Sequence, residues 1–90
     1  MRTAKKFIVK GRVQGVGFRY FTNMIANRIG VNGYVKNLYD GSVEVYAIGS
    51  EDQIRELKNS LQRGPSYSRV DKVIEEEVEI YNYMSFDIKF

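Results

Sequence analysis

The fold of this 90-residue chain is decided by the stretch Gly11-Arg12-Val13-Gln14-Gly15-Val16-Gly17-Phe18-Arg19. Before the glycines, residues 6 to 13 alternate apolar and polar side chains, which is the period of a strand. After them, from Arg19 to Ile29, apolar residues follow the spacing of a helix and Gly30 supplies a C-terminal stop; these residues are Phe21, Met24, Ile25 and Ile29. The stretch therefore predicts a strand, a glycine loop and the start of a helix.

A hairpin is predicted after this helix. Residues 33 to 37 have the pattern of a second strand, and Asp40-Gly41 marks a tight turn into a third strand over residues 43 to 48. A second helix then begins at the capping box Ser50-Glu51-Asp52-Gln53 and ends at Gly64-Pro65. Its apolar stripe is Ile54, Leu57 and Leu61.

The last part of the chain predicts two more strands, over residues 69 to 79 and, more briefly, over residues 86 to 90. The order is β-α-β-β-α-β with a strand-like tail, in one domain spanning residues 1 to 90. Such a chain forms an α+β sandwich, with two helices on one face of a mainly antiparallel sheet of four or five strands.

This topology predicts that the glycine loop and Asn37 lie close together. The first two strands are joined through a helix, so they run in the same direction and their carboxyl ends share one edge of the sheet. The glycine loop leaves the first strand at that edge, and Asn37 ends the second strand there.

The composition excludes several classes of protein. The chain has neither cysteine nor histidine, which removes zinc fingers, thiol redox chemistry, cysteine nucleophiles and histidine phosphatases. No stretch approaches the roughly 18 apolar residues of a membrane span, and the apolar run Phe7-Ile8-Val9 is too short for a signal peptide. We expect a cytoplasmic protein that does not bind a membrane.

The charge is divided unevenly along the chain. Residues 1 to 39 contain eight Lys and Arg residues and no acid, whereas the remainder contains six basic and eleven acidic residues. A basic half indicates an anionic partner, although a solvated basic face with no partner has the same composition.

The glycine loop has the features of a phosphate cradle. Small residues let successive backbone N–H groups turn toward one point, and the following helix directs its positive end there. Arg19 falls in the first helical turn, where a cation is unfavourable unless an anion is also present, and its guanidinium can bind phosphate through two bonds. The alternative is an ordinary glycine turn followed by a surface arginine. Neither a third glycine of a dinucleotide fingerprint nor a Walker Gly-Lys-Ser/Thr ending is present.

These residue types restrict the chemistry of a site. No cluster of carboxylates near the loop offers a magnesium site. Asp40 is the only nearby acid, and its position before Gly41 indicates a turn residue. Asn37, taken alone, is also compatible with a role in a turn. Backbone amides, Arg and Asn can hold a phosphoryl group and orient a water molecule, but they cannot readily protonate a leaving group. A carboxylate leaving group, with a pKa of roughly 4 to 5, needs no proton.

Segments 11 to 19, 30 to 37 and 40 to 45 resemble the acylphosphatase family, and Ala26, Gly49, Gly64-Pro65 and the tail at Phe86 and Ile88 are similar as well. The resemblance implies a ferredoxin-like fold and hydrolysis of acyl phosphates to a carboxylate and phosphate, without metal or cofactor. Inorganic phosphate would be product and inhibitor of a monomeric enzyme. By position, Arg19 would bind the phosphate and Asn37 would orient the water. The backbone amides in the site would be those of Gln14, Gly15, Val16, Gly17, Phe18 and Arg19.

Two other functions fit parts of the sequence. A ferredoxin-like sheet with Lys6, Lys10, Arg12 and Tyr46 outward invites an RNA-binding interpretation, but the basic-Gly-aromatic RNP1 pattern is absent and nucleic acid is not an expected partner. The second is a domain that senses anions without catalysis, or a module of a larger carbamoyl-transfer protein. The chain ends at Phe90 without a linker, which favours a free-standing enzyme. The acidic run of residues 75 to 77 is explained by a charged edge strand.

Overall fold

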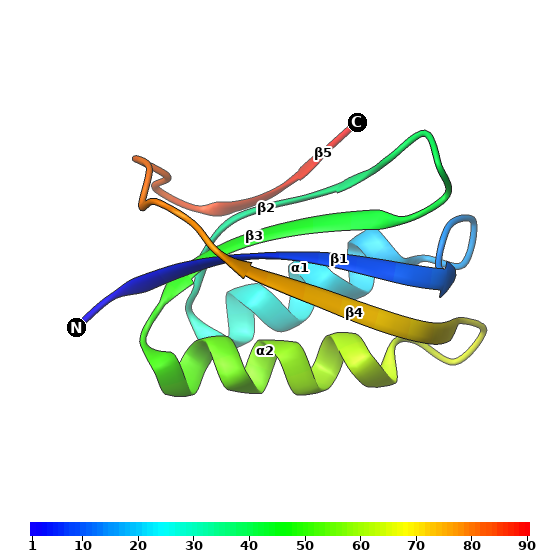
Figure 1. Ribbon diagram of the computed structural model, residues 1–90, viewed down its shortest axis with the longest axis horizontal. Helices are drawn as coiled ribbons and strands as arrows, with labels where there is room; N and C mark the ends of the chain where they lie inside the picture. Colours follow the sequence, from blue (N-terminus) through cyan, green and yellow to red (C-terminus); the bar gives the residue numbers. More distant parts are fainter.

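A computed structural model describes all 90 residues, and its elements follow the predicted order (Figure 1). They are β1 (Thr3–Arg12), α1 (Phe18–Ile29), β2 (Asn32–Asn37), β3 (Val43–Gly49), α2 (Glu51–Arg63), β4 (Arg69–Glu77) and β5 (Phe86–Lys89). The fourth strand ends at Glu77, two residues before the predicted end. The tail forms a true fifth strand.

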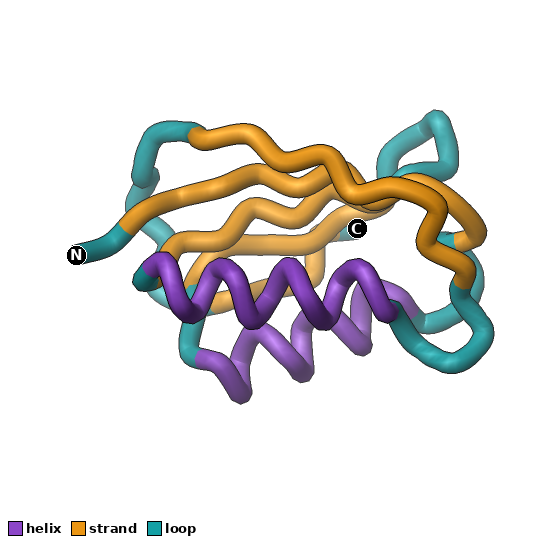
Figure 2. Tube along the Cα trace, turned by 60° about the horizontal axis from the view of Figure 1, so that its bottom comes forward, coloured by secondary structure: helices purple, strands orange, loops and turns teal.

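The five strands form one sheet in the order β4-β1-β3-β2-β5. Both β1 and β2 pair antiparallel with the central β3, and are therefore parallel to each other, as predicted. The tail strand β5 pairs parallel with β2 at one edge, and β4 forms the other edge. Both helices cover the same face of the sheet (Figure 2). This arrangement confirms the ferredoxin-like α+β fold.

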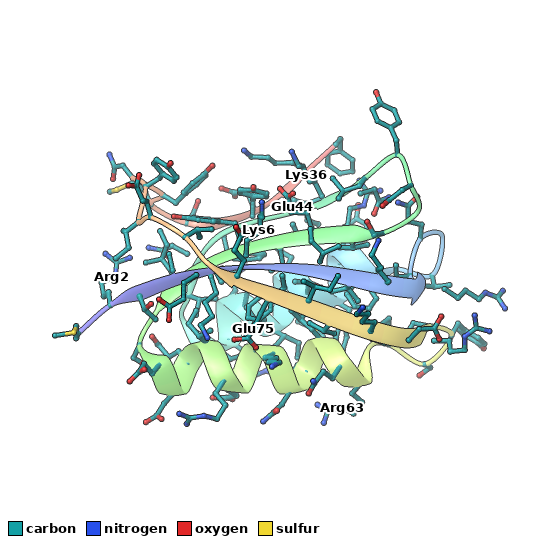
Figure 3. All side chains as sticks on the ribbon, in the orientation of Figure 1. Arg2, Lys6, Lys36, Glu44, Arg63 and Glu75 are labelled. Atoms are coloured by element: carbon teal, nitrogen blue, oxygen red, sulfur yellow. The ribbon has the colours of Figure 1, made fainter.

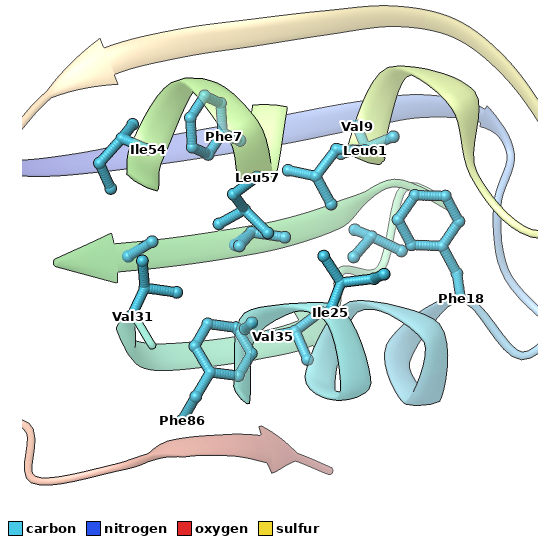
Figure 4. Close-up of a cluster of buried hydrophobic side chains, with 14 of the residues drawn as sticks. Phe7, Val9, Phe18, Ile25, Val31, Val35, Ile54, Leu57, Leu61 and Phe86 are labelled. Atoms are coloured by element: carbon cyan, nitrogen blue, oxygen red, sulfur yellow. The ribbon is translucent and has the colours of Figure 1, made fainter. Parts of the chain in front are cut away.

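The main core lies between the helices and the sheet (Figure 4). The buried residues of α1 are Phe18, Thr22, Ile25 and Ala26, whereas Met24, predicted to belong to the apolar stripe, is 53% exposed. The helix begins at Phe18, one residue earlier than predicted, and Phe18 anchors its buried stripe. Met24 is turned about 100° around the axis from Ile25, away from the sheet.

The second face of the sheet is partly covered by the segment 78 to 83. Tyr46 lies beneath it and is only 3% exposed. Its hydroxyl donates to the Glu79 carbonyl at 2.7 Å and accepts from the Tyr81 amide at 2.8 Å. Tyr46 is therefore not available for base stacking, which removes the aromatic member of the alternative RNA-binding platform.

Charged side chains lie on much of the rest of this face and along the β4 edge (Figure 3). Glu44 accepts a hydrogen bond from the Tyr34 hydroxyl at 2.6 Å and lies 3.7 Å from the Lys36 ammonium. Burial raises the pKa of the Tyr34 hydroxyl, and the hydrogen bond to the Glu44 carboxylate raises it further. On the β4 edge, Glu75 pairs with Lys5 and Lys58, which gives part of the acidic run a structural role. No helix is both long and apolar enough to cross a membrane.

Candidate active site

The glycine loop, residues 13 to 17 between β1 and α1, needs glycine for its backbone conformation. Gly15 and Gly17 have φ angles of 75° and 79°, in the left-handed region that other residues rarely adopt. A Cβ atom at either position would meet nothing within 4 Å, so space is not the constraint. The two glycines therefore serve to turn the backbone.

The loop presents backbone donors that have no acceptor within the chain. None of the amides of residues 14 to 20 donates to a backbone or side-chain acceptor; the first that does is Phe21, which donates to the Gly17 carbonyl at 3.0 Å. The Phe18 side chain is buried in the core and holds the loop against it. Free amides at a helix N-terminus form a site for an anion.

Part of this loop, the start of α1 and Asn37 line one cavity of about 140 Å³. Its lining is Val13, Gly15, Gly17, Phe18, Arg19, Tyr20 and Asn37. The predicted meeting of the loop with the end of β2 therefore occurs, and Figure 1 shows both at the same end of the sheet. A larger hollow of about 240 Å³ lies between β1, β4 and α2, but its ammonium groups are paired with Glu75. The carboxylates of this larger hollow would repel an anion, so the smaller cavity is the better candidate for an anion site.

Arg19 is half-buried in the first turn of α1 and forms no ion pair. Its guanidinium donates to the Lys89 carbonyl at 3.4 Å, and its central carbon lies 4.8 Å from the centre of the Phe90 ring. The tail strand thus supports Arg19 from one side. Sequence reasoning missed this contact, because nothing in the pattern placed β5 beside β2.

Asn37 ends β2, where its backbone is in register with Val43 of β3. Its side chain is half-buried and makes no hydrogen bond within the chain. The turn is instead held by Asp40, whose carboxylate accepts from the Ser42 amide at 2.9 Å and from its hydroxyl. These bonds, helped by Lys10, lower the pKa of Asp40 to about 2. The turn therefore does not use the Asn37 side chain.

The side chain of Gln14 was not among the predicted functional groups, since only its backbone amide was assigned. Its Nε2 donates to two carbonyl oxygens of the β2–β3 turn, Leu38 at 2.8 Å and Ser42 at 2.9 Å. A single amide thus connects the glycine loop with the turn that follows Asn37. The available signal was a polar side chain directly before the first glycine of the loop, Gly15.

No three His, Cys, Asp or Glu side chains are grouped as they would be around a metal ion. The lining residues include glycines with unpaired backbone amides, one arginine and one asparagine, which are residue types that suit an oxyanion.

The chain is similar to known proteins over nearly its whole length. The acylphosphatase family model matches residues 5–88. An acylphosphatase of Pasteurella multocida is 49% identical over 96% of this chain and 97% of its own length. The crystal structure of acylphosphatase from Bacillus subtilis superimposes with a TM-score of 0.95 at 36% identity, with complete coverage of both chains. Full-length HypF in its phosphate- and nucleotide-bound form gives 0.90 at 29% identity, but only 12% of that chain is covered. The family match and the near-complete coverage show that this chain belongs to the acylphosphatase family.

Proposed function

We propose that this enzyme hydrolyses the carboxyl–phosphate bond of an acyl phosphate by attack of water on phosphorus, without a metal ion. The proposal rests on one observation: Gly15, Gly17, Phe18 and Arg19, whose backbone amides have no acceptor within the chain, line the same cavity as Asn37, whose side chain makes no hydrogen bond. An anion with several oxygens is the ligand that such a set of donors fits.

The phosphoryl group is bound by the amides of residues 14 to 19 and by Arg19. The amides point positive ends at the phosphate oxygens, and the N-terminus of α1 adds its dipole. Arg19 closes the ring with charge-assisted bonds, which are stronger than bonds between neutral groups. Because these donors are already positioned, they stabilise the charge that spreads over the phosphoryl oxygens as the bond breaks.

Water is oriented by the Asn37 side chain and attacks phosphorus on the side opposite the leaving carboxylate. The P–O bond to the acyl group breaks, and its electron pair leaves on the carboxylate oxygen. The attacking water loses a proton to solvent, so the products are a carboxylate and inorganic phosphate. A carboxylate needs no proton to depart, which fits a cavity without an acidic side chain.

Hydrolysis of acetyl or benzoyl phosphate, with a phosphate monoester as control, tests this proposal. We expect turnover of the acyl phosphates alone, with competitive inhibition by inorganic phosphate, and no change when EDTA is added. Activity that EDTA removes and magnesium restores would overturn the metal-free mechanism. Phosphate binding without turnover would favour the anion-sensing alternative. One chain supplies the whole proposed site, so we expect an active monomer, which sedimentation of the active protein can test.

A further inference from the structure

The side chain of Gln14 connects the glycine loop, part of which lines the cavity, with the β2–β3 turn that follows Asn37. It comes from the glycine loop, and its Nε2 group uses both of its hydrogens on the β2–β3 turn, at 2.8 Å to the Leu38 carbonyl and 2.9 Å to the Ser42 carbonyl. These two residues face each other across the turn, since the Leu38 amide also donates to the Ser42 carbonyl at 2.9 Å. Gln14 is therefore bonded to both sides of the turn at once.

The turn that Gln14 holds begins directly after Asn37. Asn37 is the last residue of β2, and its side chain has no hydrogen bond of its own to fix it in the cavity. Its position relative to the glycine loop therefore depends on its backbone, which is held by the pairing with Val43 and by the turn that follows. Apart from Gln14, the described side-chain bonds of this turn connect it only to itself or to the exposed Lys10.

We infer that Gln14 is a positioning residue: its side-chain amide sets the distance between the amide cradle and Asn37, and hence the place of the attacking water. The inference rests on the proposed function and adds a specific residue to it. The turn carbonyls keep one backbone donor each, from Gly41 and Leu38, without Gln14. Loss of the bridge is therefore expected to move the turn without unfolding it.

Gln14→Met tests this role, because methionine has a similar length and no hydrogen to donate. A shift of about 1 Å in a positioned group can lower a rate about 100-fold, so we expect kcat to fall between about 10- and 100-fold. The inhibition constant of inorganic phosphate should stay within about threefold, since the amides of the cradle remain. Gln53→Met is the matched control, because the Gln53 side chain also donates a hydrogen bond to a backbone carbonyl, that of Ile29. Gln53 lies shortly after the end of β3 that is opposite the β2–β3 turn. We expect that variant to keep the wild-type kcat.

A double-mutant cycle with Asn37→Ala distinguishes positioning from general damage. If Gln14 acts through Asn37, Gln14→Met should lower kcat no further in the Asn37→Ala background. Three results would each overturn the inference. One is a full additional loss of kcat in that background, and another is an unchanged kcat in Gln14→Met alone. The third is a phosphate inhibition constant that rises as much as kcat falls. An unchanged kcat in Asn37→Ala alone would instead overturn the proposed function. If Gln14→Met does not fold, Gln14→Asn takes its place in the cycle, because its shorter side chain cannot span both carbonyls.

Discussion

Arg19→Ala removes the only charged side chain that lines the 140 Å³ cavity. If the guanidinium makes two charge-assisted bonds to phosphate, each is worth about 1.5–3 kcal/mol, and about 3–6 kcal/mol is lost together. At about 1.4 kcal/mol for each factor of ten, kcat/KM should fall about 100- to 10,000-fold. Phosphate inhibition should weaken in parallel, because in the proposed mechanism Arg19 binds phosphate before and during the reaction.

The stability of the protein should hardly change in the same variant. Arg19 loses its contact with the Phe90 ring, worth about 0.5–1 kcal/mol at an exposed site. Its removal also relieves an unfavourable cation at the N-terminus of α1, worth about 0.3–1 kcal/mol. These effects oppose each other, so the melting temperature should stay within about 4 °C of the wild-type value.

Steady-state kinetics with benzoyl phosphate, phosphate inhibition and thermal unfolding together measure these effects. Arg28→Ala is the matched control, because Arg28 is exposed in the last turn of the same helix, where its charge is favourable. That variant should keep full activity and be slightly less stable. A wild-type phosphate inhibition constant in folded Arg19→Ala would refute the assignment of Arg19 to the phosphate.

Three further predictions concern other positions. Asn37→Ala should lower kcat about 100-fold and leave phosphate inhibition nearly intact, since water positioning matters only on the way to the transition state; equal losses in kinetic assays would contradict this role. Asp40 has its pKa lowered to about 2, so its stabilising effect is complete above pH ~4 and lost as the pH falls through ~2. Urea unfolding should therefore show Asp40→Asn less stable than wild type at pH 7, with a difference that shrinks as the pH falls from ~4 through ~2; a constant difference would contradict this. Tyr46→Phe leaves two backbone groups without their partner and should lower the free energy of unfolding by about 1–3 kcal/mol with unchanged kcat, which urea unfolding and the same assay can check.

Much of the fold could be predicted because local signals and global topology agree. The capping box at Ser50 forms as expected, with Gln53 and Ser50 each donating a backbone amide to the other's side chain. The left-handed conformation of Gly30 ends α1 as predicted. From these boundaries, the parallel direction of β1 and β2 followed from chain connectivity alone.

The contacts that could not be predicted join segments far apart in the sequence. The pairing of β5 with β2 depends on where the segment 78 to 83 crosses the sheet, and that crossing is fixed by the buried hydroxyl of Tyr46. The spacing of apolar and polar residues along the sequence does not indicate such a contact. The Gln14 bridge has the same character, since it spans 24 residues to Leu38.

The cavity and the β2–β3 turn beside it contain two kinds of polar group that differ in their hydrogen bonding. The amides of the glycine loop and the Asn37 side chain have no partner in the chain, so they can bind substrate without first breaking a bond. By contrast, the Gln14 Nε2 group and the Asp40 carboxylate are hydrogen-bonded to groups of the β2–β3 turn. Electrostatic stabilisation is effective only if the donors do not rearrange during the reaction. In the proposed site, the unpaired donors lie next to segments that the Gln14 hydrogen bonds hold together. A substitution of the Gln14 side chain should therefore lower kcat by displacing Asn37, while the backbone amides that bind phosphate remain.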